Sequence, residues 1–170
     1  MKARRKQAGP RVVETVEHGS STFPIVGIGA SAGGLEAFAE LLKALPIDTG
    51  MAFVLVQHLS PDHESTLSDI LSKSTKLPVL EATHGMAIRP NHVYIIPPNK
   101  SMTVSRGILQ ILPRSAFGPH LPIDHFMRSL ANDRQQYAIG VILSGSGTDG
   151  TQGLDEIKAA GGITFAQTEA

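Results

Sequence analysis

Three residues whose types together can hydrolyse an ester stand far apart in the chain: Ser31, His58 and Asp149. A serine hydroxyl is a weak nucleophile until a neighbouring base removes its proton, and histidine is suited to that task near neutral pH. A carboxylate on the other ring nitrogen fixes the imidazole tautomer and stabilises the imidazolium. The set therefore predicts a Ser-His-Asp triad, provided that the fold brings the three side chains together.

Glycines surround the predicted nucleophile and acid. Ser31 stands in a G-x-S-x-G pattern with Gly29 and Gly33, which is typical of a nucleophile elbow between a strand and a helix. Asp149 lies in the glycine-rich stretch 144–150. Backbone N–H groups in such turns can stabilise an oxyanion, typically by about 3 kcal/mol per donor. We expect the N–H groups of Ala32 and Ser146 to be these donors.

The same first turn also matches a second chemistry. Gly27, Gly29 and Ala32 fit the dinucleotide-binding pattern G-x-G-x-x-G/A. That site needs an acidic residue at the end of the second strand to hold the ribose, but Gln57 and His58 stand there. A dinucleotide site remains the weaker alternative, and in either case we expect the two glycines to permit a sharp turn.

Each residue of the predicted triad also has an ordinary structural interpretation. Ser31 could cap the helix that begins near Gly33, and Asp149 could cap the helix that follows it. His58 could be a hydrogen-bonded loop histidine. A serine, a histidine and an aspartate at the ends of three strands are harder to obtain by chance, so together they favour the triad.

Apolar segments alternate with amphipathic ones along most of the chain, which is typical of a mostly parallel sheet with helices on both faces. Expected strands are Pro24–Gly29, Met51–Gln57, Pro78–Glu81, His92–Ile96, Tyr137–Leu143 and Ile163–Ala166. Helices are expected around 35–45 and 67–71, from Pro122 onward, and over about 150–160, with an inserted β-hairpin turning at Gly107. The predicted class is a doubly wound α/β fold. Ligands of such sheets bind beyond the carboxyl ends of the strands, where all three triad residues are expected.

The amino-acid composition argues against several classes of function. Lysine plus arginine and aspartate plus glutamate both number 15, so the zero net charge argues against nucleic acid as a main partner. The absence of cysteine excludes a disulfide framework and a cysteine nucleophile, and it fits a reducing cytoplasm. No apolar run is long enough for insertion into a membrane, and the histidines form no recognisable metal set.

We expect one catalytic domain over 23–170, continuing past Ala170, preceded by a disordered basic arm over 1–22.

These residues lie in stretches that resemble the catalytic domain of the CheB-type protein-glutamate methylesterases of bacterial chemotaxis. The matching stretches are 27–34, Gln57-His58 and 141–150, with weaker matches at 93–100 and 166–170. The resemblance implies a doubly wound α/β fold, with Ser31, His58 and Asp149 as the triad and no metal or cofactor. It also implies hydrolysis of glutamate γ-methyl esters on methyl-accepting chemoreceptors to glutamate and methanol, with deamidation of receptor glutamines in many members.

The resemblance extends to chemotaxis fusion proteins in which an opening esterase domain is joined to methyltransferase and sensor modules. The loop 60–64 carries that likeness. A non-catalytic docking or regulatory module that keeps the fold within such a fusion protein is the second alternative, ranked above the dinucleotide site.

Overall fold

Six parallel strands form the central sheet of the computed structural model, which describes residues 22–31, 34–58, 67–114, 119–143 and 147–168. The strand order is β3-β4-β2-β1-β7-β8, and each neighbouring pair is parallel. The strands are β1 (Ile25–Ala30), β2 (Ala52–Gln57), β3 (Val79–Glu81), β4 (Val93–Ile95), β7 (Ala138–Ile142) and β8 (Ile163–Ala166). Each lies within two residues of its predicted bounds. The predicted arm falls outside the described residues except for Thr22, so it stays a prediction.

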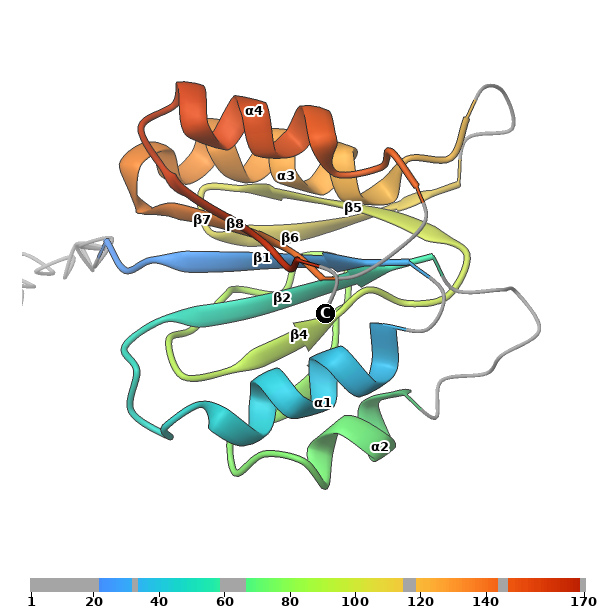
Figure 1. Cartoon of the computed structure of the whole chain (residues 1–170), viewed down its shortest axis with the longest axis vertical. Coiled ribbons are helices and arrows are strands. Elements are labelled where there is room, and N and C mark those ends of the chain that lie inside the picture. The colour runs from blue at the N-terminus through green and yellow to red at the C-terminus, as the bar shows by residue number, and fades with distance from the viewer. Residues whose placement is uncertain (1–21, 32–33, 59–66, 115–118, 144–146, 169–170) are drawn as a thin grey trace, which may run out of the picture.

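Helices cover both faces of this sheet (Figure 1). On one face lie α1 (Gly34–Ala44) and α2 (Leu67–Ser72), and on the other lie α3 (Pro122–Arg134) and α4 (Thr151–Ala159). A short 3-10 helix, η1 (Gln135–Tyr137), joins α3 to β7. Pro122 takes the first position of α3, where its missing N–H costs nothing and its fixed φ suits the helix. The doubly wound α/β prediction is confirmed. The described residues contain no helix long and apolar enough to cross a membrane.

The two helical layers enclose separate hydrophobic cores, because successive residues of a strand point to opposite faces. Val26 and Ile28 of β1 pack on the α1–α2 side with Phe38, while Ile25 joins the opposite core with Phe126 and Leu130. All six residues are at most 6% exposed. The central strand therefore belongs to both cores at once.

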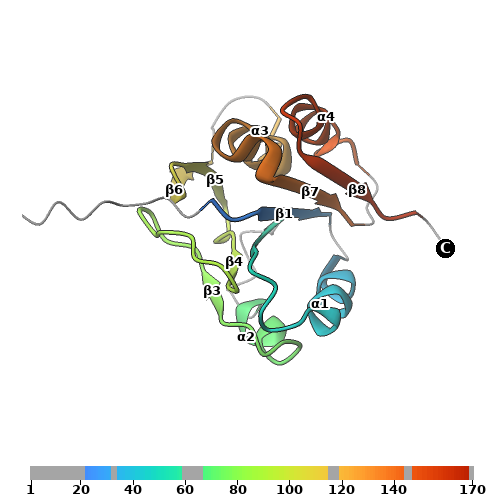
Figure 2. The ribbon, with the colours of Figure 1, turned by 90° about the vertical axis from the view of Figure 1, so that its left-hand side faces the viewer.

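The predicted hairpin is confirmed as a separate antiparallel pair, β5 (Lys100–Ser105) and β6 (Ile108–Pro113), which packs beside α3 (Figure 2). Its turn residues Arg106 and Gly107 have φ values of 51° and 72°. Positive φ at both positions is what a two-residue type I′ turn requires. The carboxylate of Asp133 on α3 accepts the N–H groups of both turn residues, which joins the hairpin to the helix.

Gly27 and Gly29 do not form a sharp turn, so that expectation was wrong. Both lie inside β1, beneath α3. A Cβ added at Gly29 would lie 2.5 Å from Cγ2 of Ile123, and one at Gly27 would lie 2.9 Å from Sδ of Met127. The two glycines instead leave room for α3 to approach the backbone of the central strand.

Candidate active site

The carboxyl ends of three adjacent strands, β2, β1 and β7, meet at one edge of the sheet. Ala30 at the end of β1 pairs with Gln57 at the end of β2, so the next residues, Ser31 and His58, emerge side by side. The loop after β7 carries Asp149 to the same edge. This is the position at which open α/β sheets bind their ligands.

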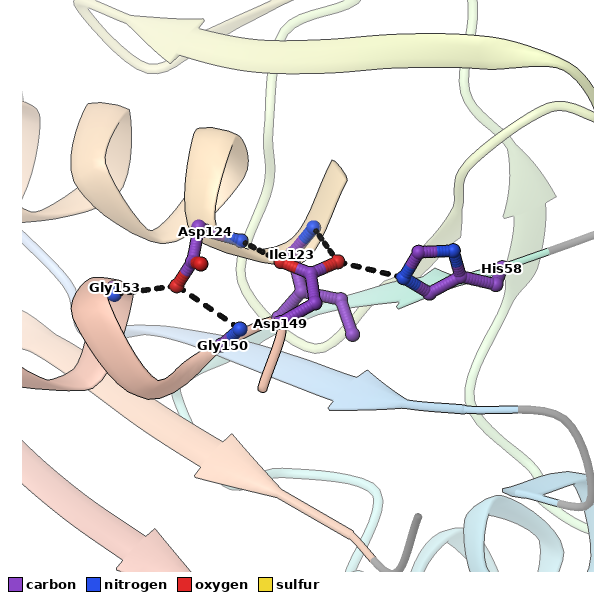
Figure 3. Close-up of polar contacts among 6 residues, drawn as sticks. All are labelled: His58, Ile123, Asp124, Asp149, Gly150 and Gly153. Carbon is purple, nitrogen blue, oxygen red and sulfur yellow. Dashed lines mark hydrogen bonds and ion pairs between the residues drawn. The ribbon is translucent and has the colours of Figure 1, made fainter. Parts of the chain in front are cut away.

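His58 and Asp149 are directly joined. Nε2 of His58 lies 2.7 Å from Oδ2 of Asp149 (Figure 3). The Asp149 side chain is 7% exposed, whereas that of His58 is 36% exposed and keeps access to a substrate. A carboxylate at Nε2 favours the tautomer that carries its proton there, which leaves Nδ1 unprotonated as the basic nitrogen. Two members of the predicted triad are thus brought together.

The Asp149 carboxylate is held by the first turn of α3. Its Oδ2 accepts the N–H of Ile123 at 3.1 Å, and its Oδ1 accepts the N–H of Asp124 at 2.8 Å. Helix N-termini favour negative charge, because their first N–H groups have no partner within the helix. Asp149 does not cap the following helix: the N-cap position of α4 is Gly150, which makes no side-chain capping bond. The alternative interpretation of Asp149 as the cap of α4 was therefore wrong.

Ser31 is positioned through its own carbonyl group. That carbonyl accepts the N–H of Gly34 at 3.0 Å and the side-chain amide of Gln57 at 3.3 Å. The serine is half-buried and lines the same cavity as His58 and Asp149. Between these described residues there is no hydrogen bond from the Ser31 hydroxyl to the His58 ring. Such bonds are often long in unliganded sites and tighten when substrate binds.

The shared cavity has a volume of about 390 Å³. It is lined by polar groups of the predicted triad and by apolar side chains: Ala30, Ser31, His58, Leu121, Ile123, Ile142, Leu143, Gly147, Thr148 and Asp149. The apolar part can accommodate a small alkyl group beside the nucleophile. A polar head and an apolar wall in one cavity suit a short ester.

A second cavity adjoins the first at Leu121. It is lined by His120, His125 and Arg128 among others, so both of these histidines lie beside the site. The His120 ring packs edge-on against His58, with 5.8 Å between ring centroids. Burial lowers the pKa of His120, and the charges of Arg114 and His58 lower it further, against a smaller opposing effect of Asp149. The expected oxyanion donors, Ala32 and Ser146, lie outside the described residues.

The sequence pattern of the CheB methylesterase family matches residues 26–170. The chain belongs to that family. A CheB methylesterase catalytic domain from Thermotoga maritima has the same fold, with a TM-score of 0.74 and 30% identity, over 84% of this chain and 78% of the other.

Curated members of the CheB methylesterase family show the same similarity in sequence. The protein-glutamate methylesterase/protein-glutamine glutaminase of Photorhabdus laumondii is 37% identical over 155 residues, which cover 88% of this chain and 44% of the relative. The corresponding protein 3 of Burkholderia lata is 39% identical over the same length, which covers 88% of this chain and 42% of the relative. The chain thus spans less than half the length of these relatives.

The strand geometry of this CheB-family chain disfavours the dinucleotide alternative. A nucleotide pyrophosphate needs open backbone at the glycine turn, but Ile123 packs against Gly29. The end of β2 carries Gln57 and His58 in place of a ribose-binding acid. Across the described ranges, no group of three or more histidine, cysteine, aspartate or glutamate side chains could hold a metal ion.

Two residues of the site were missed by sequence reasoning. Gln57 holds the Ser31 carbonyl, and Asp124 donates its N–H to Asp149. Asp124 stands in the first turn of a helix, where an acid is normally explained by the helix dipole alone. Its position after Pro122 was the only available signal, and that signal does not reveal which element lies opposite.

Proposed function

We propose that this chain is the catalytic domain of a serine esterase that hydrolyses glutamate γ-methyl esters on chemoreceptors, releasing glutamate and methanol. The observation that carries the proposal is the His58–Asp149 pair, 2.7 Å apart, in the cavity that Ser31 also lines. The names of the relatives supply the substrate class. Because the chain spans less than half of those relatives, activity and substrate are both proposed here.

Ser31 is the proposed nucleophile. Its Oγ attacks the ester carbonyl carbon while Nδ1 of His58 takes the hydroxyl proton, and the carbonyl π electrons move to the oxygen. Asp149 holds Nε2–H of His58 and stabilises the positive charge that the ring acquires. The N–H groups of Ala32 and Ser146 are the proposed donors to the oxyanion.

Collapse of the tetrahedral intermediate breaks the bond to the methoxy oxygen, which leaves as methanol with the proton held by His58. Water then attacks the acyl-serine, again with His58 as base, and glutamate and Ser31 are regenerated. The same steps with an amide release ammonia, so deamidation of receptor glutamine requires no further group. The apolar wall formed by Leu121, Ile123 and Ile142 suits the methyl group.

A methanol-release assay on carboxyl-methylated receptor tests this proposal. Ser31→Ala is expected to lower kcat by at least about 10³-fold, since removal of a nucleophile leaves only the catalysis due to binding and oxyanion contacts. Ser105→Ala, an exposed hairpin serine, is the matched control and is expected to retain activity. Equal rates for wild type and Ser31→Ala would refute the mechanism.

A fluorophosphonate probe distinguishes an esterase from a docking module that keeps only the fold. The probe reacts with activated serines, so an esterase is labelled at Ser31 and the labelling depends on His58. A docking module is not labelled.

The cytoplasmic location, the absence of a cofactor and the fusion to methyltransferase and sensor modules stay predictions.

A further inference from the structure

Asp124 is a buried carboxylate to which the proposed mechanism assigns no role. It is only 5% exposed. A carboxylate is costly to bury unless hydrogen bonds compensate for its lost hydration. The partners of Asp124 therefore indicate what it does.

Those partners tie Asp124 to the loop that carries Asp149. Oδ1 of Asp124 accepts the N–H of Gly150 at 2.9 Å and the N–H of Gly153 at 2.7 Å. In return, the backbone N–H of Asp124 donates to Oδ1 of Asp149. Figure 3 shows this exchange: the side chain of Asp124 is directed at the start of α4, and the side chain of Asp149 is directed at the start of α3.

Neither helix supplies its own side-chain cap. The N-cap residues are Leu121 for α3 and Gly150 for α4, and neither makes a side-chain capping bond. Asp149 caps α3 and Asp124 caps α4, each across the space between the helices. The approach is close because Gly153 faces α3, where an added Cβ would lie 2.4 Å from Cβ of Met127.

Because Gly150 is the neighbour of Asp149, its hydrogen bond to Asp124 affects the position of the predicted catalytic acid. Gly150 follows Asp149 directly, so Asp124 fixes the peptide that leaves Asp149 while α3 fixes its carboxylate. Without the Asp124 carboxylate, the buried N–H groups of Gly150 and Gly153 lose their acceptor. A buried donor without a partner is costly, so the turn is expected to shift toward water and to take Asp149 with it.

We propose that Asp124 is a positioning residue that keeps Asp149 aligned with Nε2 of His58. Asp124 acts through hydrogen-bond acceptance and does not touch the substrate. The expected effect on catalysis rests on the proposed function. The alignment of Asp149 with His58 is a structural property that can be measured without substrate.

The test compares Asp124→Ala with Asp124→Asn in the full 170-residue chain. Asparagine keeps an oxygen that can accept both N–H groups, whereas alanine removes it. Long-range ¹H–¹⁵N spectra of the histidine rings report which ring nitrogen of His58 carries the proton, and His58→Gln assigns the signals. Wild type and Asp124→Asn are expected to show the Nε2–H tautomer, and Asp124→Ala a mixture of tautomers.

Kinetics on methylated receptor provide the second measurement. Asp124→Ala is expected to lower kcat by about 10- to 100-fold, because small misplacements of catalytic groups have effects of that size. KM is expected to change less than about threefold, since the Asp124 carboxylate is bonded to the start of α4 and does not line the cavity that holds Ser31. Asp124→Asn is expected to stay within about threefold of wild type in both.

Asp133→Ala is the matched control for a purely structural cap. Asp133 also lies on α3 and also accepts two backbone N–H groups of another element, those of Arg106 and Gly107. It is expected to lower Tm by a few degrees, as Asp124→Ala does, but to leave the His58 tautomer and kcat unchanged. If Asp124→Ala fails to fold, Asp124→Ser replaces it, because a serine hydroxyl is too short to reach both N–H groups.

The proposal is overturned if Asp124→Ala, or its serine replacement, behaves as Asp133→Ala does in both the tautomer and kcat. It is also overturned if Asp124→Asn loses as much as alanine, since the effect would then depend on charge. A failure of the proposed function looks different: wild type would release no methanol, while the His58 tautomer would still respond to Asp124→Ala.

Discussion

Ile123 packs its side chain over Gly29, and its backbone N–H donates to Asp149 at 3.1 Å. One residue of α3 therefore sets both the distance between helix and central strand and the position of the predicted catalytic acid. We therefore expect changes in the packing beneath Ile123 to alter kcat.

Gly29→Ala is expected to lower the free energy of unfolding by about 2 kcal/mol, because the added methyl group would overlap Ile123. It is also expected to lower kcat by about tenfold, since α3 must move together with its bond to Asp149. Gly27→Ala is the matched control, because its methyl group meets Met127, Leu130 and Phe126, which lie further along the helix than Ile123. Denaturant unfolding and methanol release measure the two effects. Equal losses of kcat in both variants would contradict the link through Ile123.

Asp149→Asn is expected to lower kcat by about 10³- to 10⁴-fold. The asparagine amide would hold His58 in the wrong tautomer and would not stabilise the imidazolium. Asp155→Asn, on the exposed side of α4, is the control and is expected to match wild type. Initial rates at saturating methylated receptor provide the measurement. Retention of more than about a tenth of the wild-type rate would show that Asp149 is not the orienting acid.

Gln57→Leu is expected to separate activity from stability. The Gln57 amide holds the Ser31 carbonyl, while its own buried Oε1 has no hydrogen-bond partner in the described residues. Leucine therefore removes one good bond and one unsatisfied acceptor, so stability is expected to change by less than about 1 kcal/mol. The rate is expected to fall about tenfold, because Ser31 is less firmly placed. Calorimetry and methanol release together check this, and a large drop in Tm with full activity would contradict it.

His120 is expected to make stability depend on pH. Its pKa is lowered in the folded protein, first by burial and then by Arg114 and His58. The unfolded chain thus binds the proton at a higher pH than the folded one, and stability falls as pH falls through the ordinary value of 6.5 toward the lowered one. His120→Gln is expected to be less sensitive to acid over that range. Urea unfolding at pH 8 and at pH 5 measures the difference, and identical pH dependence in both chains would refute it.

Local sequence signals were sufficient for the strands and for bringing two residues of the predicted triad, His58 and Asp149, to the same edge of the sheet. The alternation of apolar segments with amphipathic ones predicted all six strands of the sheet, and Pro122 correctly predicted the start of α3. The strand ends then placed His58 and Asp149 at one edge, where the structure joins them.

What failed were contacts made between elements far apart in the sequence. Glycines in a tight turn and glycines beneath a helix look alike locally, so the sequence predicts a turn at Gly27 and Gly29 where the structure has α3 lying on β1. Likewise, an aspartate beside a helix start is normally expected to cap that helix. The exchange in which Asp124 and Asp149 each cap the other's helix depends on two helices lying side by side, which no local pattern reveals.

The candidate triad straddles two hydrophobic cores. Ser31 leads into α1, which rests on one core, whereas Asp149 is held by α3 and α4, which rest on the other. Proteins open locally in contiguous cooperative units that often coincide with supersecondary motifs, each with its own free energy of opening. If the two layers open separately, opening of either one separates nucleophile from acid. Activity is then expected to be lost at the opening temperature of the weaker layer, below the global melting of the domain.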